Sequence, residues 1–247
     1  MNALALAPKV DHLAATTGRV RRFLGMPEDE PTELTFFNEG RIAIAHATTA
    51  AEHVRLLRDG ERQRGFNGAY QLVNGPINPQ VFHRYEPNKI HRAWNGRVND
   101  TMIQTLRAVF LDCDPERLKG ISATDLEKQS AREVAAAVAD FFSKSVGESA
   151  IGRGDSGNGF FVLLALEPCQ PSTETTTKIS KLLGLLHRKF GKPGVKIDTS
   201  VSNPARLMPA AGTWKRKGWS TSERPHRMTT FTCADDVTRV PLEAICG

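Results

Sequence analysis

The hydrophobic pattern is most regular in the second half of the chain. Residues 105–114, TLRAVFLDCD, hold an apolar run that stops at two aspartates, which predicts a buried strand. Residues 122–147 follow with apolar positions at helical spacing and a Thr-x-x-Glu capping signature at their start, which predicts a helix. The buried face of that helix is expected to hold Val134, Val138 and Phe141.

Further segments complete this pattern. Residues 149–154 and 159–166 are joined by DSGN, a composition typical of a hairpin. Residues 174–191 carry a second helical pattern and lead into the short apolar run at 195–198. The resulting order, β-α-β-β-α-β, is the split βαβ plan of ferredoxin-like and RNA-recognition-type domains. In this plan the first and third strands are central neighbours, and the second and fourth lie at the edges.

The first half is less regular but also mixes helices with strands. It predicts a short helix within residues 10–25, two strands within 33–46, a helix at 48–63 and a strand entering a turn at 69–79. Near the other end of the chain, 226–233 is a candidate strand. The fold class is therefore α/β (α+β).

Composition and charge restrict the class of partner. The chain has 247 residues, 40% of them hydrophobic and 24% charged, which suits one large domain or two small ones. Lysine and arginine outnumber aspartate and glutamate by 33 to 27, and the net charge of +6 fits a polyanionic partner. Charge alone does not identify that partner, because many proteins without one are equally basic.

The cysteines and the apolar runs bear on location. The four cysteines form no CxxC pair, and no histidine stands at zinc-ligand spacing from them, which argues against a zinc module or a disulfide scaffold. A reducing, cytoplasmic location is the expectation. The start of the chain has no basic leader, and no run approaches the roughly 20 apolar residues of a membrane span, so we expect no contact with a membrane.

Three aspartates form the first candidate site. Asp112 and Asp114 point to the same face of the predicted strand, whereas Cys113 points to the other. Asp198 ends the last strand of the same predicted sheet and can approach them. Such an oxygen-only set suits Mg²⁺ or Mn²⁺ better than zinc. The alternative is that strand-ending aspartates serve as turn and cap residues, as a lone Asp-x-Asp pair usually does.

Two further segments could bind phosphate. The turn DSGNG could direct backbone amides at an anion, although a hairpin without a ligand explains it equally well. Its candidate residues are Ser156, Gly157, Asn158 and Gly159. The segment 196–218 places several cations shortly after Asp198, and a solvated surface would not explain its NPAR and AGT steps. Its candidate residues are Arg206, Lys215 and Lys217.

Two weaker interpretations concern single residues. Arg117 follows the two aspartates and could assist with phosphate, but a surface salt bridge is as good an explanation. Trp94, Trp214 and Trp219 could stack on bases, yet core packing is the better expectation for any single tryptophan. Trp214 is the exception to test, because it lies inside the basic segment.

Taken together, three motifs resemble a known family. FLDCDPERLKGISATDLE, DSGNGFFVLLAL and KIDTSVSNPARLMPAAGTWKRKG, in this order, resemble the archaeo-eukaryotic primase superfamily. The resemblance is to the primase-polymerase domains of bacterial plasmids, phages and integrated elements, and it spans about residues 67–218. It implies a two-lobed core, with an N-terminal α/β module at 1–104 and an RNA-recognition-like catalytic module at 105–247.

The resemblance also implies roles for residues. Asp112, Asp114 and Asp198 fall on the family's acidic positions and would be metal ligands. The phosphate-binding motif falls on the turn at 156–159, but Phe161 stands where the family usually has a histidine. That departure either weakens nucleotide binding or moves the task to the cations of segment 196–218.

The implied function is template-dependent nucleotidyl transfer. Two Mg²⁺ or Mn²⁺ ions would be cofactors, nucleoside triphosphates the substrates and single-stranded DNA the template, with a replicative helicase as a further partner. Two alternatives remain open. One is a replication-initiation or nucleic-acid-binding module that has lost turnover, for which Phe161 is the best argument. The other is a metal-dependent nuclease that uses the same acids.

Overall fold

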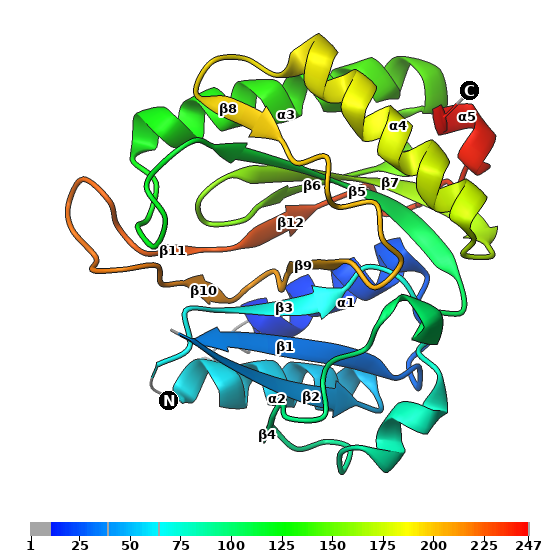
Figure 1. Ribbon diagram of the computed structural model, residues 1–247, viewed down its shortest axis with the longest axis vertical. Helices are drawn as coiled ribbons and strands as arrows, with labels where there is room; N and C mark the ends of the chain where they lie inside the picture. Colours follow the sequence, from blue (N-terminus) through cyan, green and yellow to red (C-terminus); the bar gives the residue numbers. More distant parts are fainter. Residues whose placement is uncertain (1–10, 39, 64, 247) are drawn as a thin grey trace, which may run out of the picture.

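The computed structural model describes residues 11–38, 40–63 and 65–246. They form two lobes, each built on a five-stranded sheet, stacked one above the other in Figure 1. All paired strands within the two sheets run antiparallel. Every helix in the described part of the chain is too short or too polar to cross a membrane.

The first lobe contains most of the N-terminal half. Its sheet is completed by a strand from far along the chain and is covered by one helix, α2 (Ala50–Arg62). In spatial order the strands are β4 (His91–Arg92), β2 (Arg41–Ala47), β1 (Thr32–Asn38), β3 (Gly68–Leu72) and β9 (Leu207–Pro209). The helix packs Leu56 and Leu57 against apolar residues of β1 and β2, because these leucines lie on one face of the helix.

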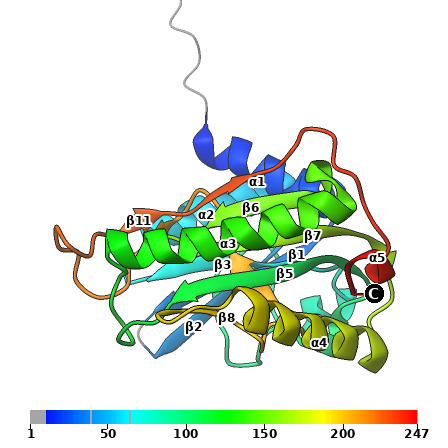
Figure 2. The ribbon, with the colours of Figure 1, turned by 90° about the horizontal axis from the view of Figure 1, so that it is seen from above.

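The second lobe contains the split βαβ unit. Helices α3 (Asp125–Val146) and α4 (Thr173–Phe190) lie side by side on one face of its sheet (Figure 2). In spatial order the strands are β12 (Thr230–Thr232), β6 (Ile151–Asp155), β7 (Phe160–Cys169), β5 (Leu106–Pro115) and β8 (Val195–Ile197). The short elements around the two sheets are η1 (Pro79–His83), η2 (Asp100–Met102), η3 (Glu148–Ala150), β10 (Trp214–Lys215), β11 (Arg227–Met228) and α5 (Leu242–Cys246).

The predicted strand order is confirmed with one difference. The first and third strands of the unit, β5 and β7, are central neighbours, and the fourth, β8, lies at the edge beside β5. The second strand, β6, is not an edge, because β12 pairs with it through Phe231 opposite Gly154. The candidate strand near the end of the chain thus extends the sheet beyond the β-α-β-β-α-β unit.

Helix α3 confirms its predicted start but not its whole predicted face. Thr124 and Glu127 make both hydrogen bonds of the capping box. Phe141, expected in the core, is 39% exposed, whereas its neighbour Phe142 is 2% exposed. Phe142 continues the spacing of Val138, four residues earlier, and Phe141 therefore turns to the flank of the helix.

The sequence predicts that the lobes divide between residues 104 and 105, but two segments belong to the lobe opposite to the expected one. Strand β9 belongs to the second half of the sequence but pairs with β3 in the first lobe. Helix α1 (His12–Leu24) belongs to the first half, and its Phe23 packs edge-on against Phe231 in the core of the second lobe. Each lobe is therefore built from both halves of the chain.

Two helical glycines should respond to alanine with opposite signs. Gly60 of α2 is buried, and a Cβ there would lie 2.7 Å from Cδ1 of Phe36, so Gly60→Ala should destabilise the protein by about 1–3 kcal/mol through overpacking. Gly18 of α1 has no atom within 4 Å of a built Cβ, so Gly18→Ala should stabilise by about 1 kcal/mol through helix propensity. Urea denaturation followed by circular dichroism measures both; equal stability of the two variants would contradict the packing argument.

Candidate active site

Strand β5 delivers two carboxylates to one face of the second lobe's sheet. Asp112 and Asp114 are partly exposed, whereas Cys113 between them is fully buried on the other face. This is the alternation that the sequence predicts for a strand. Burial raises the pKa of the Cys113 thiol, which keeps it protonated and out of the chemistry.

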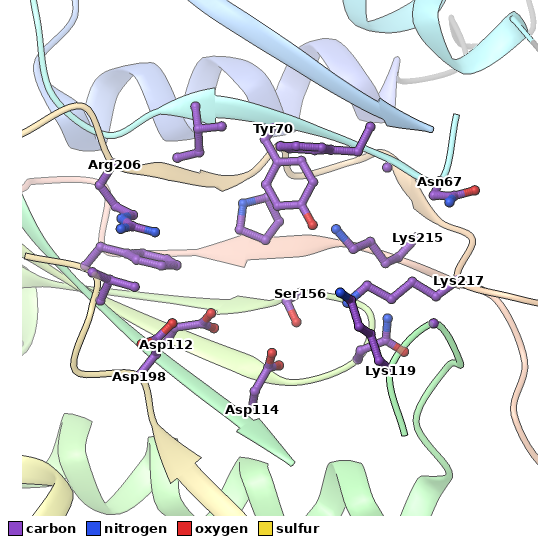
Figure 3. Close-up of a pocket in the computed structure, with 18 of the residues that line it drawn as sticks. Asn67, Tyr70, Asp112, Asp114, Lys119, Ser156, Asp198, Arg206, Lys215 and Lys217 are labelled. Carbon is purple, nitrogen blue, oxygen red and sulfur yellow. The ribbon is translucent and has the colours of Figure 1, made fainter. Parts of the chain in front are cut away.

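The third aspartate joins this pair through the neighbouring strand. Asp198 follows β8, and its backbone N–H donates to the carbonyl oxygen of Asp112 over 2.9 Å. One carboxylate oxygen of Asp198 accepts from the backbone N–H and hydroxyl of Ser200, at 2.9 and 2.7 Å. Figure 3 shows Asp112 and Asp198 beside each other, with Asp114 further along the strand. Residues 84 positions apart in the chain (198 − 114) therefore share one face.

The carboxylates repel one another. The pKa of Asp112 is raised well above its ordinary value, first by burial and then by the negative charges of Asp114 and Asp198. Lys217 and Arg206 act in the opposite direction, but more weakly. A cation bound between these carboxylates would offset the repulsion that Lys217 and Arg206 only partly reduce.

The three aspartates open into a pocket of about 620 Å³ between the two lobes. The second lobe supplies the carboxylates, and the first lobe supplies Tyr70 on β3, which faces them across the pocket in Figure 3. Pocket residues of interest for chemistry are Asn67, Tyr70, Arg97, Asp112, Asp114, Arg117, Lys119, Ser156, Asn158, Asp198, Asn203, Arg206, Lys215 and Lys217. Among the described residues that line it there is no histidine or cysteine, so its polar groups are carboxylates, amides, hydroxyls, ammonium groups and guanidinium groups.

Lys215 is a buried cation in the wall of this pocket. Its ammonium lies 3.7 Å from the centre of the Tyr70 ring, and no carboxylate of the described residues pairs with it. A Cβ on Gly68 or on Gly157 would lie within 2.9 Å of its side chain, so these two glycines leave the room it occupies. Burial, together with the nearby charge of Lys217, lowers the pKa of Lys215 well below its ordinary value.

Lys217 and Arg117 also line the pocket. Burial and the charge of Arg117 lower the pKa of Lys217, while Asp114 and Asp112 raise it. Arg117 donates to the carbonyl oxygens of Ile121 and Pro115, at 3.2 and 3.0 Å, and so braces its own loop. The salt bridge considered for Arg117 from the sequence is not found among the described residues.

Arg206 occupies the acidic end of the pocket. Its guanidinium donates to the side chain of Asn203 at 2.9 Å and to the carbonyl oxygen of Ser200 at 3.0 Å, so part of its fork is already used. Burial lowers its pKa, and attraction to Asp198 and Asp112 opposes that shift. In Figure 3 it lies on the side of Asp112, away from Lys215 and Lys217. The pocket thus has its carboxylates and Arg206 toward one end and Lys215 and Lys217 toward the other.

Three backbone amides of the glycine-rich turn make hydrogen bonds within the turn itself. The N–H groups of Ser156, Gly157 and Gly159 all donate within the turn, at 3.0, 2.7 and 2.8 Å. Only the side chains of Ser156 and Asn158 line the pocket. Gly159 has a different use: a Cβ there would overlap the Asp114 carboxylate and lie 2.6 Å from the carbonyl oxygen of Cys113.

Phe161 is part of the core and not of the pocket lining. It is 1% exposed, lies opposite Asp112 in the sheet, and contacts the rings of Phe110 and Phe231 with centroids 5.5 and 6.3 Å away. A phenyl ring there cannot bind phosphate. Phosphate binding in this pocket would depend on the lysines.

The sequence missed several pocket residues. Tyr70, Asn67 and Arg97 come from the weakly patterned first half, where nothing in the pattern marks a residue that faces the other lobe. Lys119 lies two residues after Arg117 in the loop that follows β5, and this basic run was its only signal. The expectation of core packing is wrong for Trp94 and Trp219, which are 72% and 92% exposed, and Trp214, the exception, is 38% exposed.

The class of fold follows from comparison with solved structures. No protein-family model matches the sequence, and no curated protein matches it. The fold is that of a primase-polymerase domain of the AEP type. The particular structure it resembles is the AEP domain (PP-N190) of the cyanophage S-2L primase-polymerase, with a TM-score of 0.55 and 14% sequence identity over 94% of this chain and 97% of that one. At this identity the likeness establishes the fold.

Proposed function

We propose that this protein is a DNA primase-polymerase, which joins nucleotides from nucleoside triphosphates into primers on single-stranded DNA and extends them. The observation that supports this most is the pocket of about 620 Å³, where two carboxylates of β5 and one that follows β8 share a cavity with lysines that no described carboxylate pairs with. Carboxylates can hold the divalent cations that assist phosphoryl transfer, and lysines can bind the phosphates of a nucleoside triphosphate. The shared fold with a primase-polymerase domain is consistent with this assignment.

The donor set fits a hard divalent cation. Asp112, Asp114 and Asp198 offer only oxygen, and the raised pKa of Asp112 is the mark of repulsion that a cation would relieve. As they stand, no three acidic, histidine or cysteine side chains of the described residues are placed to hold a metal ion, so this ligand set is a proposal. When bound, Mg²⁺ or Mn²⁺ would lower the pKa of a primer 3′-hydroxyl and neutralise charge on the triphosphate.

The remaining residues would position the substrate. Lys215 and Lys217 would bind the triphosphate at the basic end of the pocket, because a buried ammonium without a carboxylate partner gains most from an anion. Arg206 would steady the negative charge at the acidic end. Ser156 would present its hydroxyl from the turn as a further donor.

Other parts of the sequence-based hypothesis stay predictions. They are an origin in a plasmid, phage or integrated element, a cytoplasmic location, and a recruited helicase. The alternative of a nucleic-acid-binding module that has lost turnover is not favoured. Its best argument was Phe161, but Phe161 lies in the core, and the pocket has both carboxylates and lysines.

The test is primer synthesis from unprimed single-stranded DNA. The protein is incubated with a circular single-stranded template, labelled nucleotides and Mg²⁺ or Mn²⁺, with EDTA as the control. We expect new labelled oligomers that require both the template and the metal. DNA binding without any product in either metal would favour the module without turnover, and metal-dependent degradation of the template would favour the nuclease.

A further inference from the structure

One exposed tryptophan, Trp219, follows directly after the basic segment 196–218, in a loop that hydrogen bonds hold in place. Trp219 is 92% exposed, the most exposed large hydrophobic residue in the described part of the chain. It lies in the loop 216–226 between β10 and β11, which projects from one end of the molecule in both ribbon views (Figures 1 and 2). An indole gains from leaving water, so an indole kept in water calls for an explanation.

The loop is not loosely placed. Arg224 forms a two-pronged salt bridge with Glu127 of α3, at 2.8 and 3.0 Å. The hydroxyl of Ser122 donates to the carbonyl oxygen of Lys217 at 3.0 Å, and the ring of His226 bonds that of Gly218 at 2.9 Å. These contacts fix the backbone on both sides of Trp219. The backbone position of Trp219 is therefore fixed relative to the rest of the protein.

A second loop lies against the first. Gly218 is so close to Gly120 that a Cβ at 218 would lie 2.7 Å from the carbonyl oxygen of Gly120. This second loop carries Leu118, which is 77% exposed, and Lys119, which lines the pocket. We name Leu118, Lys119 and Trp219 the rim surface. Lys119 lines the pocket, as do Gly120 and Gly218, which adjoin Lys119 and Trp219 in the chain.

The charge of this surface is unusual. Three arginines in or beside the loop 216–226 are paired within the protein: Arg216 with Glu61, Arg224 with Glu127 and Arg227 with Asp125. Within the described residues Lys119 and Lys217 have no carboxylate partner. An exposed indole can stack on a nucleic-acid base, and lysines without a carboxylate partner can bind the phosphates of its backbone.

We propose that the rim surface binds single-stranded DNA, with a base stacked on Trp219 and a backbone phosphate at Lys119. The choice of DNA rests on the proposed function; the surface itself rests on the contacts above. A single strand is required, because in a duplex the faces of the bases are already covered by their neighbours. The strand would then enter the pocket past Gly218 and reach the carboxylates as template.

The experiment measures binding without catalysis. Fluorescence anisotropy of a labelled oligothymidylate is recorded with no nucleotide and no divalent metal, for the parent protein and three variants. Trp219→Ala should weaken binding by about tenfold, and Trp219→Phe should retain affinity within about threefold, since a phenyl ring still stacks. The matched control is Trp94→Ala, which removes another exposed tryptophan, one that follows the edge strand β4 of the first lobe, and it should bind like the parent.

The outcomes separate this inference from the proposed function. Parent-like binding by Trp219→Ala, or no binding by the parent itself, would overturn the rim surface even if primers are made. Loss of binding in Trp219→Ala would support it even if no primer is ever made. If a labelled duplex shows the same loss as the single strand, stacking on an unpaired base is overturned, because the contact would not depend on free base faces.

Discussion

Replacing Asp112 and Asp114 together by asparagine is expected to reduce primer synthesis by about 1,000-fold or more, which corresponds to about 4 kcal/mol of transition-state stabilisation. Asparagine keeps the shape of aspartate but removes the charge that would hold a divalent cation. Extension of a pre-annealed primer, measured with and without Mn²⁺, reports the effect. The matched control is Asp140→Asn on the exposed surface of α3, which should be as active as the parent.

The same variant should not be less stable than the parent. The pKa of Asp112 is raised in the folded protein, so near neutral pH its negative charge opposes folding, and the opposition grows as pH rises from the unfolded pKa through the folded one. Asparagine removes it. We therefore expect a melting temperature at or above that of the parent, together with parent-like DNA binding. If the variant were inactive and also less stable, unfolding could explain the loss of activity. If it were stable and active, the proposal that Asp112 and Asp114 are catalytic would be refuted.

Lys215→Met should lower the affinity for nucleoside triphosphate by about 100-fold and yet raise the melting temperature by about 5 °C. The affinity falls because a buried ammonium is lost from the basic end of the pocket. The stability rises because that ammonium is 5% exposed, unpaired among the described residues, and replaced by an apolar side chain of similar length. Lys181→Met, at an exposed position on α4, is the control and should change neither quantity.

The gain in stability should depend on pH. Since the pKa of Lys215 is lowered in the folded state, the folded protein gives up this proton before the unfolded chain does, so the parent becomes relatively more stable as pH rises toward the ordinary lysine pKa of about 10.4. The difference in melting temperature between Lys215→Met and the parent should therefore shrink between about pH 7 and about pH 10. A difference that stays constant would mean that the lysine is not buried as a charge.

Much of the second lobe was predictable because its signals are local. The alternation around Asp112 and Asp114, the capping box of α3 and the hairpin at DSGN each depend on a few neighbouring residues, and each is present. The strand order followed from the plan of the split βαβ unit. The approach of Asp198 to Asp112 was then a consequence of pairing β8 with β5.

The features that the sequence did not predict depend on contacts between segments that are distant in the chain. Tyr70 faces the acids only because the first lobe is folded over the second, and no short-range pattern records that. Phe141 and Phe142 lie seven and eight residues after Val134, and both spacings fit one helical face, so the pattern alone does not decide which is buried. In the structure Phe142 enters the core, and Phe141 lies at the flank against Phe190 of α4. The N–H groups of Gly157 and Gly159 donate to side chains two or three residues away, which the glycine-rich motif alone does not reveal.

The exchange of segments between the lobes restricts how such a protein can change over time. Since β9 completes the first sheet and α1 completes the second core, neither half of the sequence contains all of its own lobe. Recombination near residue 104 would leave each product with an unfilled edge or an uncovered apolar face. A lineage of this architecture would therefore be expected to inherit its pocket whole, and to vary it through single positions on the facing walls instead of by shuffling pieces.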